Sequence, residues 1–197
     1  MLDGQFRHRT RDLTVFGPAG TRARLEHAME VLFPGSSSVQ RRFGVHVFEC
    51  VDRSTLELGP LRVTPYEVRH ASGASAYALR VDGPQASVAY SGDTEWTDAL
   101  LEAADGVDLI LCEGYGLSPV RWHLALDTLG RYRDQLTCRR LVLTHLSVSA
   151  LASDLSGWQV APRTAGVSIF DSHASRFLVG DRPAAQAQPR RRSGCST

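Results

Sequence analysis

Four polar side chains with the potential for metal or acid–base chemistry stand at the ends of segments that have the pattern of buried strands. They are His70, Asp93, Glu113 and His145. A fifth, His123, follows a loop and opens a segment with helical periodicity. Imidazole and carboxylate groups are the ligand set of Zn²⁺ and similar divalent ions, and a carboxylate can bridge two such ions. Ions bound in this way lower the pKa of a bound water towards neutrality.

Each of these residues also has a structural interpretation. A histidine at the end of a strand is commonly a surface or capping residue. Asp93 is placed to cap a helix over 94–105, because its carboxylate could accept from free backbone N–H groups. The other histidines match no strand-end pattern and are interpreted as surface or structural groups: His8, His27, His46 and His173. Residue types and spacing alone therefore leave both a metal site and a set of structural roles open.

The clearest secondary-structure pattern lies over residues 79–113 and the few residues before them. The expected elements are a strand at 76–81, the turn Gly83-Pro84, a strand at 86–91, a helix at 94–105 that ends at Gly106, and a buried strand at 107–112. An open α/β sheet binds its ligands at the carboxyl ends of its strands. This order of elements therefore predicts that Asp93 and Glu113 lie at one edge of a sheet.

Shorter patterns flank this segment on both sides. The expected elements are strands at 13–16, 45–51, 55–58 and 61–68, a helix at 22–33 capped by Thr21, a helix at 123–136, a strand at 140–144, a short helix at 147–155 and a last strand at 166–170. Strands that alternate with helices indicate an α/β fold. We interpret residues 1–170 as one such domain and residues 171–197, which are of low complexity, as a disordered or atypical tail.

Composition excludes several classes of protein. A chain of 197 residues is large enough for a hydrophobic core, and its net charge of +1 gives no electrostatic reason to bind nucleic acid or a membrane. No apolar run approaches the roughly 18 residues of a membrane span, and no signal segment opens the chain. The cysteines form no CxxC pair, and Cys50 and Cys112 are expected to be free, buried thiols. A reducing, cytoplasmic compartment fits this pattern.

Five short motifs occur in an order that resembles the metallo-β-lactamase fold superfamily, and within it the ribonuclease Z and arylsulfatase-like phosphodiesterase branch. The motifs are Val68-Arg69-His70, Tyr90-Ser91-Gly92-Asp93-Thr94, Leu111-Cys112-Glu113, Trp122-His123-Leu124 and Leu143-Thr144-His145-Leu146-Ser147. The resemblance extends over residues 10–170. It implies an α/β fold, namely a partial αββα sandwich that lacks its N-terminal strands.

The resemblance also implies a role for each strand-end residue. His70 would bind a first metal, His145 would bind a second, and Asp93 would bridge the two, with zinc as the expected ion. Glu113 and His123 would form a catalytic pair near the leaving group, with His123 as the proton donor and Glu113 orienting it. The implied reaction is attack of a metal-held hydroxide on a phosphodiester or another ester.

Two features depart from the family pattern. The His-x-His-x-Asp-His string of the family does not occur in this sequence. Two protein ligands per metal then remain, which is fewer than the three that catalytic zinc sites use. The family's ribonucleases carry a long tRNA-gripping arm between the positions that match His70 and Asp93, where this chain has only 22 residues. Together with the low net charge, this argues against tRNA as a substrate.

These observations leave two functions open. The first is a metal-dependent hydrolase of a small-molecule ester or phosphodiester, impaired in this chain by the missing cluster, so that zinc binding is weak and turnover is low. The second is a non-catalytic remnant of the fold that acts as a binding or interaction module. In either case a sheet without its outer strands would expose an apolar edge, which favours self-association into a homo-oligomer.

Overall fold

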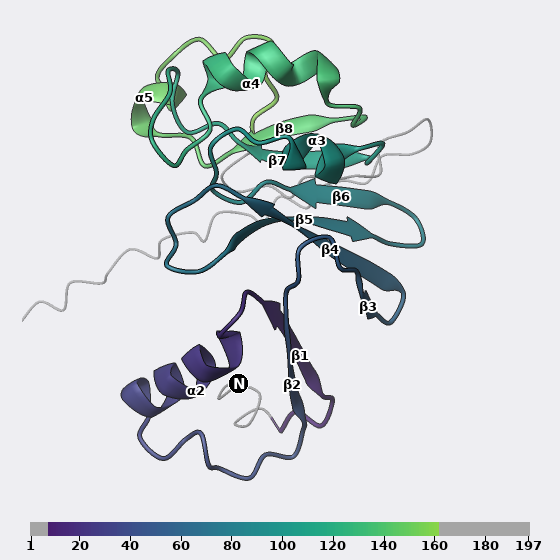
Figure 1. Cartoon of the computed structure of the whole chain (residues 1–197), viewed down its shortest axis with the longest axis vertical. Coiled ribbons are helices and arrows are strands. Elements are labelled where there is room, and N and C mark those ends of the chain that lie inside the picture. The colour runs from purple at the N-terminus through teal and green to yellow at the C-terminus, as the bar shows by residue number, and fades with distance from the viewer. Residues whose placement is uncertain (1–7, 162–197) are drawn as a thin grey trace, which may run out of the picture. The chain divides into compact units, whose positions relative to one another are not determined.

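The computed structural model describes residues 8–161, along which strands and helices alternate (Figure 1). The first three elements are β1 (Leu13–Gly17), α2 (Thr21–Leu32) and β2 (Val45–Glu49). β1 and β2 pair in parallel, and α2 is the crossover helix that a parallel pair requires. The expected cap at Thr21 is wrong, because Gly20 at φ 83° is the N-cap and the Thr21 hydroxyl donates to the carbonyl of Pro18.

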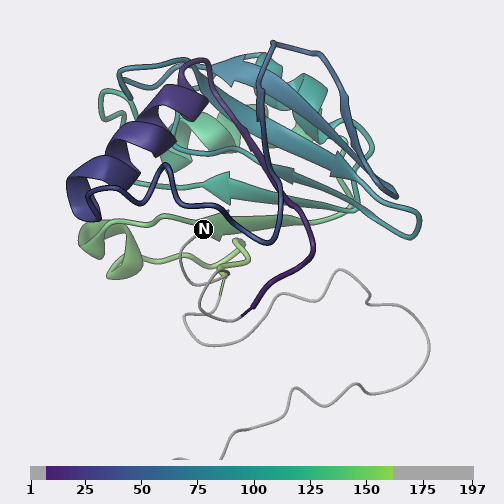
Figure 2. The same cartoon turned by 90° about the horizontal axis from the view of Figure 1, so that it is seen from below.

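A mixed sheet of six strands carries the candidate site. Its members are β3 (Leu56–Leu58), β4 (Leu61–Val68), β5 (Ala76–Asp82), β6 (Ser87–Tyr90), β7 (Leu109–Glu113) and β8 (Leu141–Thr144). They follow one another across the sheet in chain order (Figures 1 and 2). β6, β7 and β8 are parallel, and β4 runs in the direction of β6 because both are antiparallel to β5. The carboxyl ends of these four strands therefore lie at the same edge of the sheet.

The strand predictions around the β5–β6 hairpin are confirmed, and α2 lies within one residue of the predicted 22–33, whereas the other three helices are shorter than predicted. α3 spans Ala99–Ala104 rather than 94–105, and α4 spans Leu126–Tyr132 rather than 123–136, followed by a 3₁₀ turn at Arg133–Gln135. α5 spans Val148–Leu151 rather than 147–155. A bridge of Glu95 with the distant Arg69 precedes α3, and a local turn at 120–123 precedes α4.

The hydrophobic core lies between the sheet and the helices that follow it. α3 packs against β4, β5 and β6, and its Leu100 is fully buried together with Leu129 of α4 and Ile110 of β7. Trp96 stacks on Tyr132 with ring centroids 4.1 Å apart, which joins the segment before α3 to α4. The α/β class predicted from the alternation of strands and helices is confirmed.

Three further expectations concern burial, membrane spans and the end of the chain. Cys50 and Cys112 are free and buried, as predicted, and burial raises the pKa of the Cys112 thiol to about 12. Within residues 8–161, no helix has both the length and the apolar character that crossing a membrane requires. The strand expected at 166–170, the domain boundary at 170 and the tail from 171 lie outside the described residues.

Gly92, directly before Asp93, has φ 64°, and a Cβ there would lie 3.2 Å from the backbone oxygen of Tyr77. We expect Gly92→Ala to lower the free energy of unfolding by more than the roughly 1–2 kcal/mol that a left-handed conformation costs an L-residue. Gly106 is the matched control, because it has the same φ and nothing within 4 Å of its Cβ. Urea denaturation of both variants measures the difference, and equal losses would show that the contact with Tyr77 is relaxed at no cost.

Candidate metal centre

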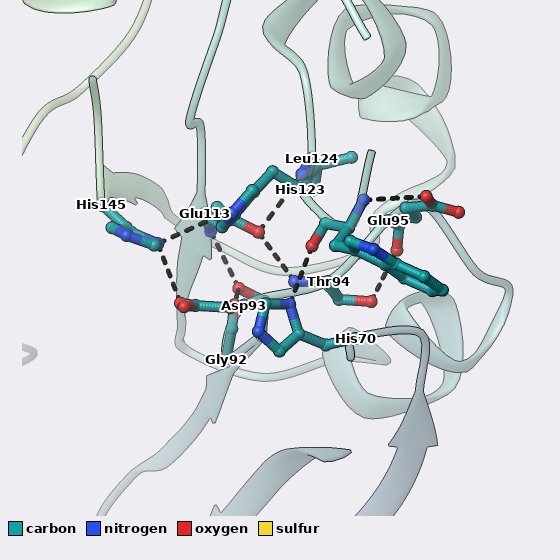
Figure 3. A network of polar contacts seen from close by, with 11 residues as sticks. His70, Gly92, Asp93, Thr94, Glu95, Glu113, His123, Leu124 and His145 are labelled. Atoms are coloured by element: carbon teal, nitrogen blue, oxygen red, sulfur yellow. Dashed lines mark hydrogen bonds and ion pairs between the residues drawn. The ribbon is translucent and has the colours of Figure 1, made fainter. Parts of the chain in front are cut away.

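The carboxyl edge of the six-stranded sheet brings the predicted site residues together (Figure 3). Asp93, Glu113 and His145 come from the ends of the three parallel strands β6, β7 and β8. A loop between β7 and α4 adds His123, and one donor atom each from Asp93, His123 and His145 lie within 4.8 Å of one another. This set of two imidazoles and a carboxylate has the number and type of protein ligands found in catalytic zinc sites.

The Glu113 carboxylate is fully buried and is held on both oxygens. Its Oε1 accepts from Nδ1 of His123 at 2.5 Å and lies 3.0 Å from Nδ1 of His145. Its Oε2 accepts from the backbone N–H groups of Thr94 at 2.8 Å and Leu124 at 3.2 Å. A carboxylate out of contact with water is tolerated only when it is paired and hydrogen-bonded. Glu113 therefore requires all of these segments to be in place.

His145 faces two carboxylates. Its Nδ1 lies 2.8 Å from Oδ1 of Asp93 and 3.0 Å from Oε1 of Glu113. The Asp93 side chain thus contacts His145 and does not cap α3, whose N-cap is Asp98. His145 and Asp93 are each 39% exposed, so this part of the site is open to solvent while Glu113 is not. His145 has φ 54°, a conformation that non-glycine residues adopt mainly where their surroundings impose it.

His70, at the end of β4, lies beside the same cluster. Its ring centroid is 5.5 Å from that of His123, and its Nδ1 donates to the backbone oxygen of Trp122 at 2.9 Å. The structure thus brings His70 next to the other site residues. The three residues whose donor atoms lie within 4.8 Å of one another are Asp93, His123 and His145, and His70 is not one of them. Figure 3 shows the His70 ring on the Asp93 side of the cluster.

The three imidazoles share one arrangement. Nδ1 of His70 is bound to a backbone oxygen, and Nδ1 of His123 and of His145 is bound to a carboxylate. In a neutral imidazole, one nitrogen donates and the other carries the lone pair, so Nε2 is left as the ligating atom of His70 and His123. Metal-ligating histidines in proteins are oriented in this way, by a carbonyl or carboxylate that accepts the second N–H. In His145 it is Nδ1 that lies beside Asp93. The donor set, two imidazoles and a carboxylate with close donor atoms, fits a zinc ion.

Tyr90 and Tyr115 complete the surroundings of the cluster. Tyr115 stacks on His123 with ring centroids 4.1 Å apart and 17° between the planes, which fixes the plane of the imidazole. Burial raises the pKa of the Tyr90 phenol, and the negative charges of Asp93 and Glu113 raise it further. Tyr90 therefore remains a neutral hydroxyl beside the carboxylates at physiological pH.

Glu95 is a site residue that the sequence patterns did not indicate. Its backbone N–H donates to the oxygen of Arg69, next to His70, and its Oε1 accepts from the backbone N–H of Trp122 at 2.8 Å. Trp122 has φ 70°, and its own oxygen accepts from His70. The backbone and the side chain of one residue therefore join the end of β4 to the loop that carries His123. In the sequence, only its position two residues after Asp93 could have drawn attention to Glu95. The neighbouring residues give no indication of its contact with Trp122.

The histidines interpreted as surface groups lie away from the cluster where the structure describes them. His46 is more than half exposed and pairs with Asp12 at 2.9 Å, and this contact lowers the pKa of Asp12. Nδ1 of His8 lies 3.3 Å from the Arg42 guanidinium. His173 lies outside the described residues.

Comparison with known sequences identifies similar proteins. The profile of a family described as "Beta-lactamase superfamily domain" matches residues 2–146. An uncharacterized protein of Mycobacterium tuberculosis is 34% identical over 137 residues, which is 67% of this chain and 49% of that protein. An uncharacterized protein of Mycobacterium leprae is 41% identical over 101 residues, which is 49% of this chain and 35% of that protein. The chain thus spans about half the length, or less, of the curated relatives it matches.

Solved structures share the fold at low identity. The metallo-beta-lactamase fold protein YhfI of Bacillus subtilis aligns with a TM-score of 0.56 and 18% identity over 73% of this chain and 56% of that chain. The short form of human tRNase Z aligns with a TM-score of 0.55 and 17% identity over 77% of this chain and 63% of that chain. Zinc-bound PqqB of Methylobacterium extorquens aligns with a TM-score of 0.55 and 16% identity over 80% of this chain and 65% of that chain. At such identities the similarity shows the fold.

The contact between Glu95 and Trp122 predicts a measurable effect that does not depend on bound metal. Glu95→Ala removes the acceptor of the Trp122 N–H, so we expect amide hydrogen exchange at Trp122 and His123 to become about tenfold faster or more. Glu95→Gln keeps an acceptor oxygen and should retain most of the protection. Glu102→Ala, which removes a surface partner of Arg53, is the control. Unchanged exchange in Glu95→Ala would show that other contacts hold this loop.

Proposed function

The chain belongs to the metallo-β-lactamase superfamily, and on that premise we propose that the cluster at the carboxyl edge of the sheet is the site of a metal-dependent hydrolase. We assign it to the ribonuclease Z and arylsulfatase-like phosphodiesterase branch, with a phosphodiester or another small ester as substrate. The observation that carries the proposal is the buried Glu113 carboxylate, which holds His123 and His145 beside Asp93. Zinc-bound PqqB, which shares this fold, supports zinc as the ion.

The metal ligands in this proposal are His70, Asp93 and His145. Nδ1 of His70 donates to a backbone oxygen, which leaves its Nε2 free, and Nδ1 of His145 lies 2.8 Å from Oδ1 of Asp93. These three side chains would hold the metal, with Asp93 shared where a second ion binds. A zinc ion held there would supply a Lewis acid for the developing negative charge and would lower the pKa of a water molecule.

The proton for the leaving group comes from His123 in this proposal. Glu113 accepts from Nδ1 of His123 at 2.5 Å, and this contact orients the ring. Stacking on Tyr115 prevents rotation of the ring, so Nε2 points in one direction. A proton donor in this position protonates the leaving oxygen as its bond to phosphorus or carbon breaks. Glu113 is then a positioning residue for both histidines.

The substrate in this proposal is a small molecule rather than tRNA. The chain between His70 and Asp93 forms mainly the β5–β6 hairpin, whose two strands are part of the sheet, and no arm extends there. The net charge of +1 also provides little attraction for a polyanion. The role of a non-catalytic binding module remains the competing proposal, because the sequence lacks the family's His-x-His-x-Asp-His string.

Zinc titration of the purified chain distinguishes the two roles. We expect one Zn²⁺ to bind weakly, Asp93→Ala and His145→Ala to abolish binding, and zinc to produce slow hydrolysis of bis(4-nitrophenyl) phosphate that a chelator stops. His46→Ala, which changes a histidine paired with Asp12, should behave as the parent chain. Two tightly bound ions would contradict the expectation of two protein ligands per metal. No binding by calorimetry would favour the non-catalytic module.

Replacement of His123 separates its two possible roles. As proton donor, His123→Ala should retain bound zinc and lose about 10²- to 10⁴-fold in kcat. The loss should be larger for a phenyl ester than for a 4-nitrophenyl ester, because 4-nitrophenolate leaves readily without protonation. Loss of zinc from His123→Ala would instead identify His123 as a metal ligand, in agreement with its distance to Asp93 and His145.

A further inference from the structure

A pocket of about 360 Å³ opens beside His123. Its walls include Glu95, Trp96, Val120, Arg121 and Thr128, together with His123 itself. Among the residues that line it, only His123 also belongs to the cluster of candidate ligands. The volume is in the range of about 300–1,000 Å³ that small-molecule sites occupy. The pocket therefore extends from the proposed proton donor away from the metal ligands.

This position suits the alcohol half of an ester. When His123 protonates a leaving oxygen, the group attached to that oxygen extends from beside the imidazole in a direction away from the metal ligands. The pocket supplies space in that direction, between the segment before α3 and the first turn of α4.

The charges in the pocket walls cancel and are already engaged. The Glu95 carboxylate accepts from the backbone N–H of Trp122, and the Arg121 guanidinium lies 4.6 Å above the Trp122 ring. The Glu95 carboxylate and the Arg121 guanidinium both contact Trp122, and their opposite charges give the pocket walls no net charge that would attract an ionic occupant. The pocket therefore favours an uncharged group.

The remaining walls are apolar and aromatic. Trp96 stacks on Tyr132 through one face of its ring, and Val120, Leu124 and Ala125 add aliphatic surface. Among the described residues, Nε1 of Trp96 is buried without a hydrogen-bond partner. A buried donor of this kind is costly unless it meets an acceptor. Because this nitrogen is not exposed to the pocket, the aromatic and aliphatic walls decide the preference, and they favour an aromatic occupant.

We propose that this pocket receives the leaving alcohol of the substrate and that it selects an uncharged aromatic ring. The assignment of the occupant as a leaving group rests on the proposed hydrolase function. Binding of the ring is a separate property of the pocket and requires neither metal nor turnover.

The test uses 4-nitrobenzyl alcohol as a neutral aromatic probe and 4-(hydroxymethyl)benzoate as its anionic counterpart. In ¹H–¹⁵N spectra of the full chain, the neutral probe should shift the indole N–H signal of Trp96, and the anionic probe should bind more weakly. Absence of any shift with the neutral probe would overturn the proposal, as would tighter binding of the anion.

Two pairs of variants locate the binding. Thr128→Phe fills the pocket from α4 and should weaken binding of the neutral probe by about tenfold or more. Its control is Asp134→Phe, on the exposed 3₁₀ turn that follows α4, which should leave binding unchanged. Val120→Asn makes one wall polar and should weaken binding severalfold, whereas Leu117→Asn should not. Val120 and Leu117 are both 43% exposed on the same loop, so neither change should disturb folding. Equal binding by Val120→Asn and Leu117→Asn would overturn the proposal.

The pocket and the hydrolase function fail in different experiments. If the probe binds and Thr128→Phe removes it while the zinc-loaded chain hydrolyses no diester, the pocket stands and the proposed function fails. If the chain hydrolyses esters and no variant alters binding of the probe, the function stands and the assignment of the pocket fails.

Discussion

The burial of one carboxylate determines the arrangement of this site. Glu113 ends a central strand between two parallel neighbours, so its side chain cannot reach water. Each of its partners comes from another segment: Thr94 after β6, His123 and Leu124 from the loop before α4, and His145 after β8. Removing an ion from water costs several kcal/mol unless such partners replace the solvent. The free energy of burying Glu113 therefore couples the ends of three strands and one loop.

Backbone strain is concentrated at the same place. Trp122 and His145 both have positive φ, a conformation that costs a non-glycine residue of order 1–3 kcal/mol and persists only where the surroundings impose it. The hydrogen bond from Trp122 to Glu95 and the contacts of His145 with two carboxylates are those surroundings. The consequence is functional, since the strained residues orient the rings of the candidate ligands and proton donor, His70, His123 and His145.

The proposed chemistry is divided between the two sides of His123. On one side lie the metal ligands, of which Asp93 and His145 are open to solvent. On the other side lies a neutral, largely apolar pocket in which Trp96 retains a buried N–H without a partner among the described residues. Glu95 lines this pocket and also fixes the loop that carries His123. A change in the loop would therefore affect the position of the proton donor and the shape of the pocket together.

The apolar pattern of the sequence determined approximately where the strands end, because that pattern depends only on a few neighbouring residues. It therefore determined that four polar residues stand at the ends of strands of an α/β sheet: His70, Asp93, Glu113 and His145. The sequence did not determine the start of α3, the partner of Asp93 or the position of His123. Those depend on hydrogen bonds between residues far apart in the chain, such as Glu95 with Arg69 and Trp122, and Asp93 with His145. Such contacts leave no local pattern in the sequence, because each of the two residues is one polar residue among many. Only the tertiary structure, which aligns the strands, decided which of them meet.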